Sequence, residues 1–310
     1  MEEKEILVLL NHSYDIEFKS LSLFRKGGCH SYIVLSSRKK YFMKVISKAF
    51  METAKQSLNV LMHLEKSGFP SPKIILTVIG LPYFDVIDND DVKSGILFEF
   101  IEGEEIDQGE GAEKIGVLVG QMHSIMKSFK EDLPVKGKEF FIDRYIDILK
   151  KKNYDPIKIE TFREYGDYLW ERAEKLPKGF CHGDLHYGNL LKTISGDIFI
   201  LDFDTSCYAF SVYDVMMICN STDYFTFDEN GYHKSTSTYE SFLKGYTKYC
   251  SLTDYEIEVF YDLIAMYHYQ LQATIIEING LDCVNDKFID NQLDWLLKWR
   301  KQCKLLSKQN

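Results

Sequence analysis

Residues 181–189 read Cys-His-Gly-Asp-Leu-His-Tyr-Gly-Asn, and residues 200–204 read Ile-Leu-Asp-Phe-Asp. The first stretch holds the carboxylate of Asp184 and the carboxamide of Asn189 with four residues between them, and the second adds the carboxylate of Asp202 after an apolar run. Phosphoryl transfer needs an alcohol positioned by a base and Mg²⁺ held on the phosphates, with little covalent help from the protein. The two stretches therefore favour kinase chemistry.

The residue types suggest how this chemistry is divided. Asp184 would accept or orient the proton of the substrate hydroxyl, and Asn189 would offer its carboxamide oxygen to Mg²⁺. Asp202 follows the apolar residues 198–201, a spacing that predicts a hairpin returning this carboxylate to the same loop. Since Mg²⁺ takes few protein oxygens and completes its shell with phosphate and water, Asn189 and Asp202 suffice as predicted metal ligands.

Two other interpretations of the loop stay open. His182 and His186 are four residues apart with Cys181 adjacent, which could indicate zinc, but Gly183 disfavours the helix on which that spacing works. Alternatively, the polar residues only brace a turn.

Lys44 is the charged residue of an otherwise apolar strand pattern, Tyr-Phe-Met-Lys-Val. A lone lysine on a strand is usually exposed to solvent, but together with the downstream loop it predicts a contact with the nucleotide phosphates. Gly27 and Gly28, just upstream, could bring backbone amides onto those phosphates, although a hairpin turn also favours two glycines.

Composition narrows the function classes. The 310 residues include 37 basic and 47 acidic ones, a net charge of −10 that argues against a general nucleic-acid binder and agrees with a cationic substrate. Seven scattered cysteines without a Cys-x-x-Cys pair fit a reducing compartment. Neither a secretory signal nor an apolar stretch of about 20 residues is visible, so we expect a cytoplasmic protein without a membrane partner. Oligomeric state is not encoded in any pattern.

The hydrophobic pattern predicts an α+β protein with strands first and helices afterwards. An acidic turn is expected at residues 85–91, between the last two strands. The boundary between an N-terminal lobe of residues 1–102 and a helical lobe of residues 103–310 is expected at Glu102-Gly103. The predicted strands are residues 18–24, 32–35, 41–46, 74–79 and 96–100, the first three as an antiparallel meander. The predicted helices are residues 2–12, 51–66, 112–126, 141–151 and 159–176, with a helical tail over residues 239–306.

Taken together, these motifs resemble the aminoglycoside phosphotransferase / choline kinase family, whose fold is protein-kinase-like with two lobes. His-Gly-Asp-Leu-His-x-Gly-Asn is similar to its catalytic loop and Leu-Asp-Phe-Asp to its metal-binding segment. The similarity extends from about residue 16 to residue 299. It includes a hinge-like Ile-Leu-Phe-Glu-Phe-Ile-Glu-Gly at residues 96–103, Gly-Gln-Met-His at 120–123 and Tyr-Asp-Val at 213–215. The homoserine-kinase-like and spore-coat-kinase-like branches are the most similar.

The resemblance implies Asp184 as the catalytic base, Asn189 and Asp202 as metal ligands, and Lys44 as the phosphate-binding lysine. ATP is the implied cofactor with Mg²⁺, GTP being possible in its place.

At the hinge, backbone groups of Glu99 and Ile101 would meet the adenine. His182 is expected to brace the catalytic loop, and Asp214 to hold the helix after it. The implied partner is a small molecule with a hydroxyl group as phosphate acceptor.

The chain departs from the family pattern at two places. Tyr187 replaces the proline usual in the catalytic loop. The helix residue that usually pairs with the lysine is Glu, whereas the aligned positions here are Gln56 and Ser57, with Glu52 a turn earlier. Either Glu52 takes that role or Lys44 has a neutral partner.

The acceptor is less well defined. Asp204, Asp223, Asp228, Glu229 and the aromatic run at residues 267–269 are candidates for a carboxylate-rich pocket that would suit an amine-bearing alcohol. The alternative is a solvated acidic face with aromatic core positions.

Two further functions remain as alternatives. One is a non-catalytic kinase-like scaffold such as a spore coat protein, against which the intact Asp184, Asn189 and Asp202 argue. The other is a protein kinase, which is disfavoured because the chain shows no activation segment after Asp202.

Overall fold

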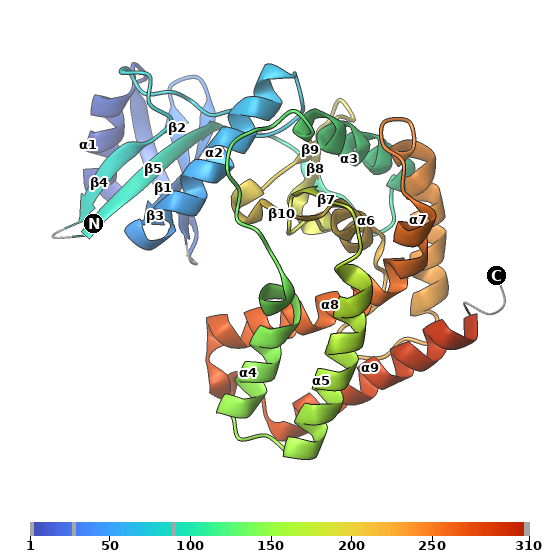
Figure 1. Cartoon of the computed structure of the whole chain (residues 1–310). Helices are drawn as coiled ribbons and strands as arrows, with labels where there is room; N and C mark the ends of the chain where they lie inside the picture. The colour runs from blue at the N-terminus through green and yellow to red at the C-terminus, as the bar shows by residue number, and fades with distance from the viewer. Residues whose placement is uncertain (1–2, 27–28, 89–90, 307–310) are drawn as a thin grey trace. The chain divides into compact units, whose positions relative to one another are not determined.

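The structure, a computed structural model, describes residues 3–26, 29–88 and 91–306 (Figure 1). Gly27 and Gly28 lie outside the described residues. The chain forms two compact units. Unit 1 comprises Met1–Ile106, Ser128–Leu133 and Tyr187–Ser206, and unit 2 comprises Asp107–Lys127, Pro134–His186 and Cys207–Asn310. Unit 1 thus includes the end of the motif at residues 182–189 together with the Asp-Phe-Asp segment. The predicted lobes of residues 1–102 and 103–310 stay a prediction.

Unit 1 is built on a five-stranded antiparallel sheet with the order β1-β2-β3-β5-β4, and a small sheet of order β6-β8-β9 belongs to the same unit. Its helices are α1 (Glu3–Ser13) and α2 (Met51–Lys66). Its strands are β1 (Phe18–Arg25), β2 (Cys29–Ser36), β3 (Lys40–Ser47), β4 (Phe84–Asp88), β5 (Asp91–Glu99), β6 (Glu104–Glu105), β8 (Leu190–Lys192) and β9 (Ile198–Ile200). The predicted meander and both predicted helices are confirmed.

Alternation along β3 places Lys44 on the sheet face opposite to α1. Met43 and Val45 join the apolar cluster that Ile6 and Leu10 of α1 form with the sheet. Successive side chains of a strand point to opposite faces, so Lys44 points away from this cluster. The hydrophobic alternation of β3 therefore fixes the side of the sheet on which the lysine acts.

The predicted strand at residues 74–79 is wrong. Only Ile74 forms a bridge, to Phe98, and the chain then enters a turn in which the Thr77 amide donates to the Leu81 carbonyl (2.8 Å) and Gly80 has a φ of 78°. Glycine tolerates this left-handed conformation without the strain a side chain would add. The β-branched composition suggested a strand, but Ile79 is 77% exposed and does not pair with a neighbouring strand.

The predicted acidic turn at residues 85–91 is also wrong in part, because its first half is strand β4. Phe84 and Val86 are buried and Asp85 between them is exposed, which is the alternation of a strand with one solvated face. The apolar period outweighs the low strand propensity of aspartate.

Unit 2 is mainly helical, as predicted, and the predicted tail consists of three separate helices. The helices are α3 (Ala112–Met126), α4 (Arg144–Lys151), α5 (Pro156–Ala173), α6 (Ser211–Cys219), α7 (Gly231–Tyr246), α8 (Asp254–Asn279) and α9 (Asp286–Leu306). The short strands β7 (Lys178–Cys181) and β10 (Cys207–Phe210), which the sequence analysis did not predict, pair antiparallel. Together these elements confirm the α+β class. Every helix in the described ranges is too short or too polar to span a lipid bilayer.

The longest helix, α8, organises unit 2. It begins with a capping box, in which the Thr253 hydroxyl accepts from the Glu256 amide and the Glu256 carboxylate accepts from the Thr253 amide. Such reciprocal capping satisfies amides that the first turn leaves without partners. The helix packs against α4, α5 and α6, so its buried face forms the centre of the unit.

Helices α3 and α7 approach each other closely through glycines. A Cβ built on Gly245 would lie 1.9 Å from the Glu113 carbonyl oxygen, and one on Gly116 would lie 2.1 Å from the Phe242 carbonyl oxygen. No side chain fits at either position without moving the backbone of the partner helix, so these two glycines set the spacing of the pair.

We expect Gly245→Ala to lower the free energy of unfolding by about 2–4 kcal/mol, because the added methyl group overlaps a carbonyl that packing prevents from moving. Gly137→Ala is the matched control, since the space around Gly137 is open. Urea denaturation of both variants measures the difference, and equal stabilities would contradict the proposed close approach.

Candidate functional site

The β8–β9 hairpin brings the two predicted metal ligands to one end. Leu190 pairs with Ile200, and beyond this pair the Leu201 amide donates to the Asn189 carbonyl (2.8 Å). Asn189 just before β8 and Asp202 just after β9 therefore lie together at the open end of the hairpin. The hairpin that the sequence predicted from the apolar run is confirmed.

Asp202 has an unusual backbone conformation. Its φ of 59° and ψ of 63° lie in the left-handed region, which few residues other than glycine, asparagine and aspartate adopt. A one-turn 3₁₀ helix, Phe203–Thr205, follows, and its Phe203 side chain is buried. The buried phenylalanine anchors the turn, so the carboxylates on either side of it have fixed positions.

Lys44 lies between these two carboxylates. Its Nζ is 2.7 Å from Asp202 Oδ1 and 2.6 Å from Asp204 Oδ2, and its side chain is 16% exposed. Burial alone would lower the lysine pKa, but the charges and hydrogen bonds of Asp204 and Asp202 outweigh it and raise that pKa above its ordinary value. Lys44 is therefore a permanent cation whose position is fixed by charge-assisted hydrogen bonds.

The residues considered as helix partners of Lys44 are arranged differently from the family pattern. Glu52 is exposed on α2, whereas Ser57 is buried and its Oγ donates to Asp204 Oδ1 (3.2 Å). The carboxylate next to the lysine thus comes from the Asp-Phe-Asp segment. Asp204, considered above as a pocket residue for the acceptor, belongs to this Lys44 cluster instead.

The donor set of this region fits Mg²⁺. Asn189 and Asp202 offer amide and carboxylate oxygens, the ligand type that this hard cation prefers. No group of three or more His, Cys, Asp or Glu arranged to hold a metal occurs within the described ranges. With Asn189 and Asp202 as protein ligands, phosphate oxygens and water would complete the octahedron.

In unit 2, the loop that carries Asp184 is fixed by a buried carboxylate. Asp214 of α6 is fully buried and accepts from the amides of His182 (2.6 Å) and Gly183 (3.0 Å). The His182 ring, also fully buried, accepts from the Asp184 amide through Nδ1 (3.4 Å). Gly183 has a φ of 84°, a conformation that favours glycine. His182 braces the loop as expected, but Asp214 holds the loop itself rather than the helix after it.

A further pair of residues extends this network. His123 of α3 contacts Asp214 Oδ2 through Nε2 (3.1 Å), and its Nδ1 contacts the hydroxyl of Tyr246 (2.9 Å). All three side chains are buried. Sequence reasoning noted His123 only as part of Gly-Gln-Met-His, and missed Tyr246 because nothing near it in the chain marks the contact.

The Asp184 carboxylate is 42% exposed and lies 3.6 Å from His186 Nε2. Burial raises the pKa of the Tyr267 hydroxyl, and the negative charge of Asp184 raises it further. The ring of Tyr267 meets the rings of Tyr213 and Tyr224 edge-on, with centroids 6.1 and 5.1 Å apart. Tyr267 therefore lies close enough to Asp184 for the charge of that carboxylate to affect its hydroxyl.

Cys181 has a partner that makes the zinc interpretation unnecessary. Its buried thiol donates to the Phe210 carbonyl (2.9 Å), and burial raises its pKa well above the ordinary value. Zinc binds the thiolate, which this environment disfavours.

The predicted hinge residues Glu99 and Ile101 lie at the end of β5 and just beyond it. The Glu99 amide at the end of β5 donates to the Lys73 carbonyl (2.9 Å) and is therefore used within unit 1. Ile101 lies two residues beyond, outside any strand, and is partly buried.

The remaining acceptor candidates mostly have structural roles. Asp228 pairs with Lys234 (2.8 Å), and Asp223 accepts from the Phe225 amide in a turn. Tyr269 is buried and donates to the Phe162 carbonyl, and burial lowers the pKa of His268 to about 3. Of the run at residues 267–269, the partly buried Tyr267 faces Asp184, so it is the member that remains a candidate.

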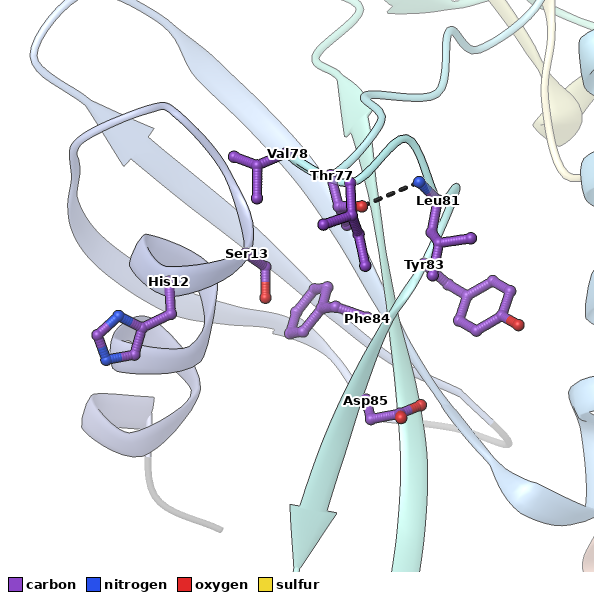
Figure 2. A pocket seen from close by; sticks show the side chains of 9 residues that line it. His12, Ser13, Thr77, Val78, Leu81, Tyr83, Phe84 and Asp85 are labelled. Carbon is purple, nitrogen blue, oxygen red and sulfur yellow. Dashed lines mark hydrogen bonds between the residues drawn. The ribbon is translucent and has the colours of Figure 1, made fainter.

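Unit 1 also contains a cavity of about 310 Å³ between the end of α1 and the segment at residues 77–85 (Figure 2). His12, Val78, Phe84 and Asp85 line it, and a hydrogen bond between Thr77 and Leu81 closes the neighbouring turn. Its lining shares no residue with the Lys44 cluster.

Comparison with known proteins identifies the family. The family model described as "Phosphotransferase enzyme family" matches residues 23–250, which include Lys44, Asp184 and the Asp-Phe-Asp segment. The chain belongs to the phosphotransferase enzyme family. It is thus an enzyme that transfers a phosphoryl group, as the sequence predicted. No curated protein matches the chain.

Solved structures show the same fold as this phosphotransferase. An amicoumacin kinase in complex with AMP-PNP and Ca²⁺ has a TM-score of 0.77 at 16% identity, covering 97% of this chain and 94% of the other. A microcompartment-associated aminopropanol kinase has a TM-score of 0.75 at 16% identity, covering 97% and 95%. An ethanolamine kinase of Plasmodium vivax has a TM-score of 0.62 at 15% identity, covering 91% and 84%. These similarities confirm the predicted kinase-like α+β fold.

We expect Asp214→Ala to lower the free energy of unfolding by about 2–4 kcal/mol, because it leaves the buried His182 and Gly183 amides without an acceptor. The exposed helical Glu171→Ala is the control and should change stability by less than about 0.5 kcal/mol. Urea denaturation measures both, and a stable Asp214→Ala variant would mean that Asp214 does not hold the loop.

Proposed function

We propose that this phosphotransferase uses ATP and Mg²⁺ to phosphorylate a hydroxyl group of a small, amine-bearing acceptor. The observation that carries the proposal is the Lys44 cluster, in which a fixed cation on a sheet strand meets the carboxylate at the end of the β8–β9 hairpin. A mostly buried lysine next to a carboxylate that can bind Mg²⁺ is suited to the phosphates of a nucleotide, because a lysine and Mg²⁺ together neutralise their charge.

In this proposal Lys44 contacts the nucleotide phosphates, and Asn189 and Asp202 hold Mg²⁺. Bound there, the metal would neutralise phosphate charge. Backbone groups of Glu99 and Ile101, at and just beyond the end of β5, would meet the adenine. ATP rather than GTP is the proposed donor.

Asp184 is the proposed catalytic base. The acceptor oxygen attacks the γ-phosphorus, the bond from that phosphorus to the bridging oxygen of ADP breaks, and the hydroxyl proton passes to the Asp184 carboxylate. Asp214 and His182 fix the backbone of the loop from which the Asp184 carboxylate extends.

The amine preference is supported by charge. The negative charge of Asp184, next to the partly buried Tyr267, would attract an ammonium group, and the net charge of −10 favours cationic ligands. Two proteins of the same fold, the aminopropanol kinase and the ethanolamine kinase, are named for amino alcohols. A cytoplasmic location, proposed from the cysteine pattern, agrees with an ATP-dependent enzyme of metabolism or drug resistance.

Asp184→Asn should lower turnover at least about 10³-fold while leaving ATP affinity within about threefold, because the carboxamide keeps the shape but cannot accept the proton. ADP release under saturating acceptor measures turnover, and calorimetry measures affinity. A variant that keeps most of the wild-type rate would remove Asp184 from the role of base.

Acceptor-dependent ADP release should appear with an amino alcohol and not with the same alcohol lacking the amine. The matched pair is 1-amino-2-propanol and 2-propanol, within a panel that adds ethanolamine, choline, homoserine, sugars and aminoglycosides. Release with sugars alone would contradict the amine preference, and ATP binding without release for any alcohol would favour the non-catalytic scaffold.

A further inference from the structure

Asp204 has contacts that the proposed catalytic roles do not use. Its Oδ2 lies 2.6 Å from Lys44 Nζ, and its Oδ1 accepts from Ser57 Oγ at 3.2 Å. Each carboxylate oxygen is thus held by a different element, one by β3 and the other by α2. The one-turn helix that carries Asp204 packs against α2, so the carboxylate is fixed by the backbone as well.

Helix α2 offers no charged partner for Lys44, so a carboxylate from another segment is needed to balance the lysine charge. Lys44 is mostly buried, and a buried cation without an anionic partner would be strongly destabilised. The α2 residue that faces the cluster is Ser57, which is 4% exposed and carries no charge, while Glu52 points to solvent. The negative charge therefore has to come from the Asp-Phe-Asp segment.

The two carboxylates of that segment differ in their surroundings. The Asp202 side chain is 47% exposed and stands at the end of the hairpin beside Asn189, whereas that of Asp204 is 35% exposed and lies against α2. Both Asp204 oxygens are held by protein donors, Lys44 and Ser57, whereas Asp202 stands beside Asn189, the other proposed metal ligand. Asp202 is suited to the metal and Asp204 to the lysine.

We propose that Asp204, supported by Ser57, is the positioning residue of Lys44 and replaces a carboxylate on helix α2. The inference rests on the proposed function, because it assigns Lys44 to the nucleotide phosphates. When Asp202 turns to Mg²⁺, Asp204 remains as the anion that keeps Lys44 in place. The nucleotide then meets a lysine that is already oriented.

Four variants test this inference. Asp204→Asn removes the charge with the shape retained. The double variant Ser57→Glu, Asp204→Ser moves the carboxylate onto α2. Asp202→Asn removes the proposed metal ligand, and Asp197→Asn, an exposed position in the β8–β9 turn, is the matched control for loss of one acidic charge. Calorimetry measures the affinity of each for ATP and for adenosine, with Mg²⁺ and with EDTA, and thermal unfolding checks that each is folded.

For Asp204→Asn we expect ATP affinity to fall about tenfold both with Mg²⁺ and with EDTA, and adenosine affinity to change less than about twofold, since adenosine has no phosphate for Lys44. The double variant should recover ATP affinity to within about threefold of the wild type. Asp202→Asn should weaken ATP only when Mg²⁺ is present, and Asp197→Asn should bind as the wild type does.

Three results would overturn the inference. Unchanged ATP affinity in Asp204→Asn would show that Lys44 needs no such partner. A loss confined to Mg²⁺ would make Asp204 a metal ligand. An equal loss for adenosine would indicate a general structural effect. If the double variant does not fold, the Mg²⁺ and EDTA comparison in Asp204→Asn still decides. Failure of the wild type to bind ATP would instead overturn the proposed function, and this inference with it.

Discussion

The ion pair of Lys44 with two carboxylates is the interaction on which the proposed nucleotide site depends. It joins residues 158 and 160 positions apart in the sequence, so it forms only when β3 and the β8–β9 hairpin are both in place. Because Lys44 is mostly buried, loss of both carboxylates would leave an uncompensated buried charge, which is destabilising. The local structure follows from this constraint: alternation along β3 selects the face of the lysine, and the buried Phe203 fixes the turn that supplies Asp204.

In unit 2 a buried carboxylate, that of Asp214, holds the local structure. Asp214 is fully buried and is stabilised by the amides of His182 and Gly183 and by the His123 ring. These hydrogen bonds also fix the loop that carries Asp184. The Tyr246 hydroxyl orients His123 in turn. The backbone around Asp184 is thus fixed by side chains of α3, α6 and α7.

The sequence predicted more of the fold than of the contacts. Strong periodicity and end signals gave α2 and α3 with the right bounds, and the apolar run before Asp202 gave the hairpin. Residues 74–79 were predicted as a strand because β-branched composition does not show whether a partner strand exists. Strand β4 was predicted as a turn because its aspartates have low strand propensity, whereas packing of its apolar residues decides the structure. The strands β7 and β10 are four residues each, too short for an alternating hydrophobic pattern to identify them.

For the site, motif residues such as Asp184, Asn189 and Lys44 could be named from their spacing, and their roles stay predictions. The partner of Lys44 could not be named, because pairing between β3, α2 and the Asp-Phe-Asp turn is set by tertiary structure. Asp204 was therefore placed with the acceptor pocket when it belongs with the lysine. The contact between His123 and Tyr246, on two different helices, was hidden for the same reason.

The most direct measurement is a crystal structure of the protein with AMP-PNP and Mg²⁺. We expect Lys44 to contact the phosphates while keeping its hydrogen bond to Asp204, and Asp202 and Asn189 to be bound to the metal. A structure in which Lys44 stays on Asp202 and the nucleotide phosphates lie elsewhere would contradict the assignment of this cluster to phosphoryl transfer.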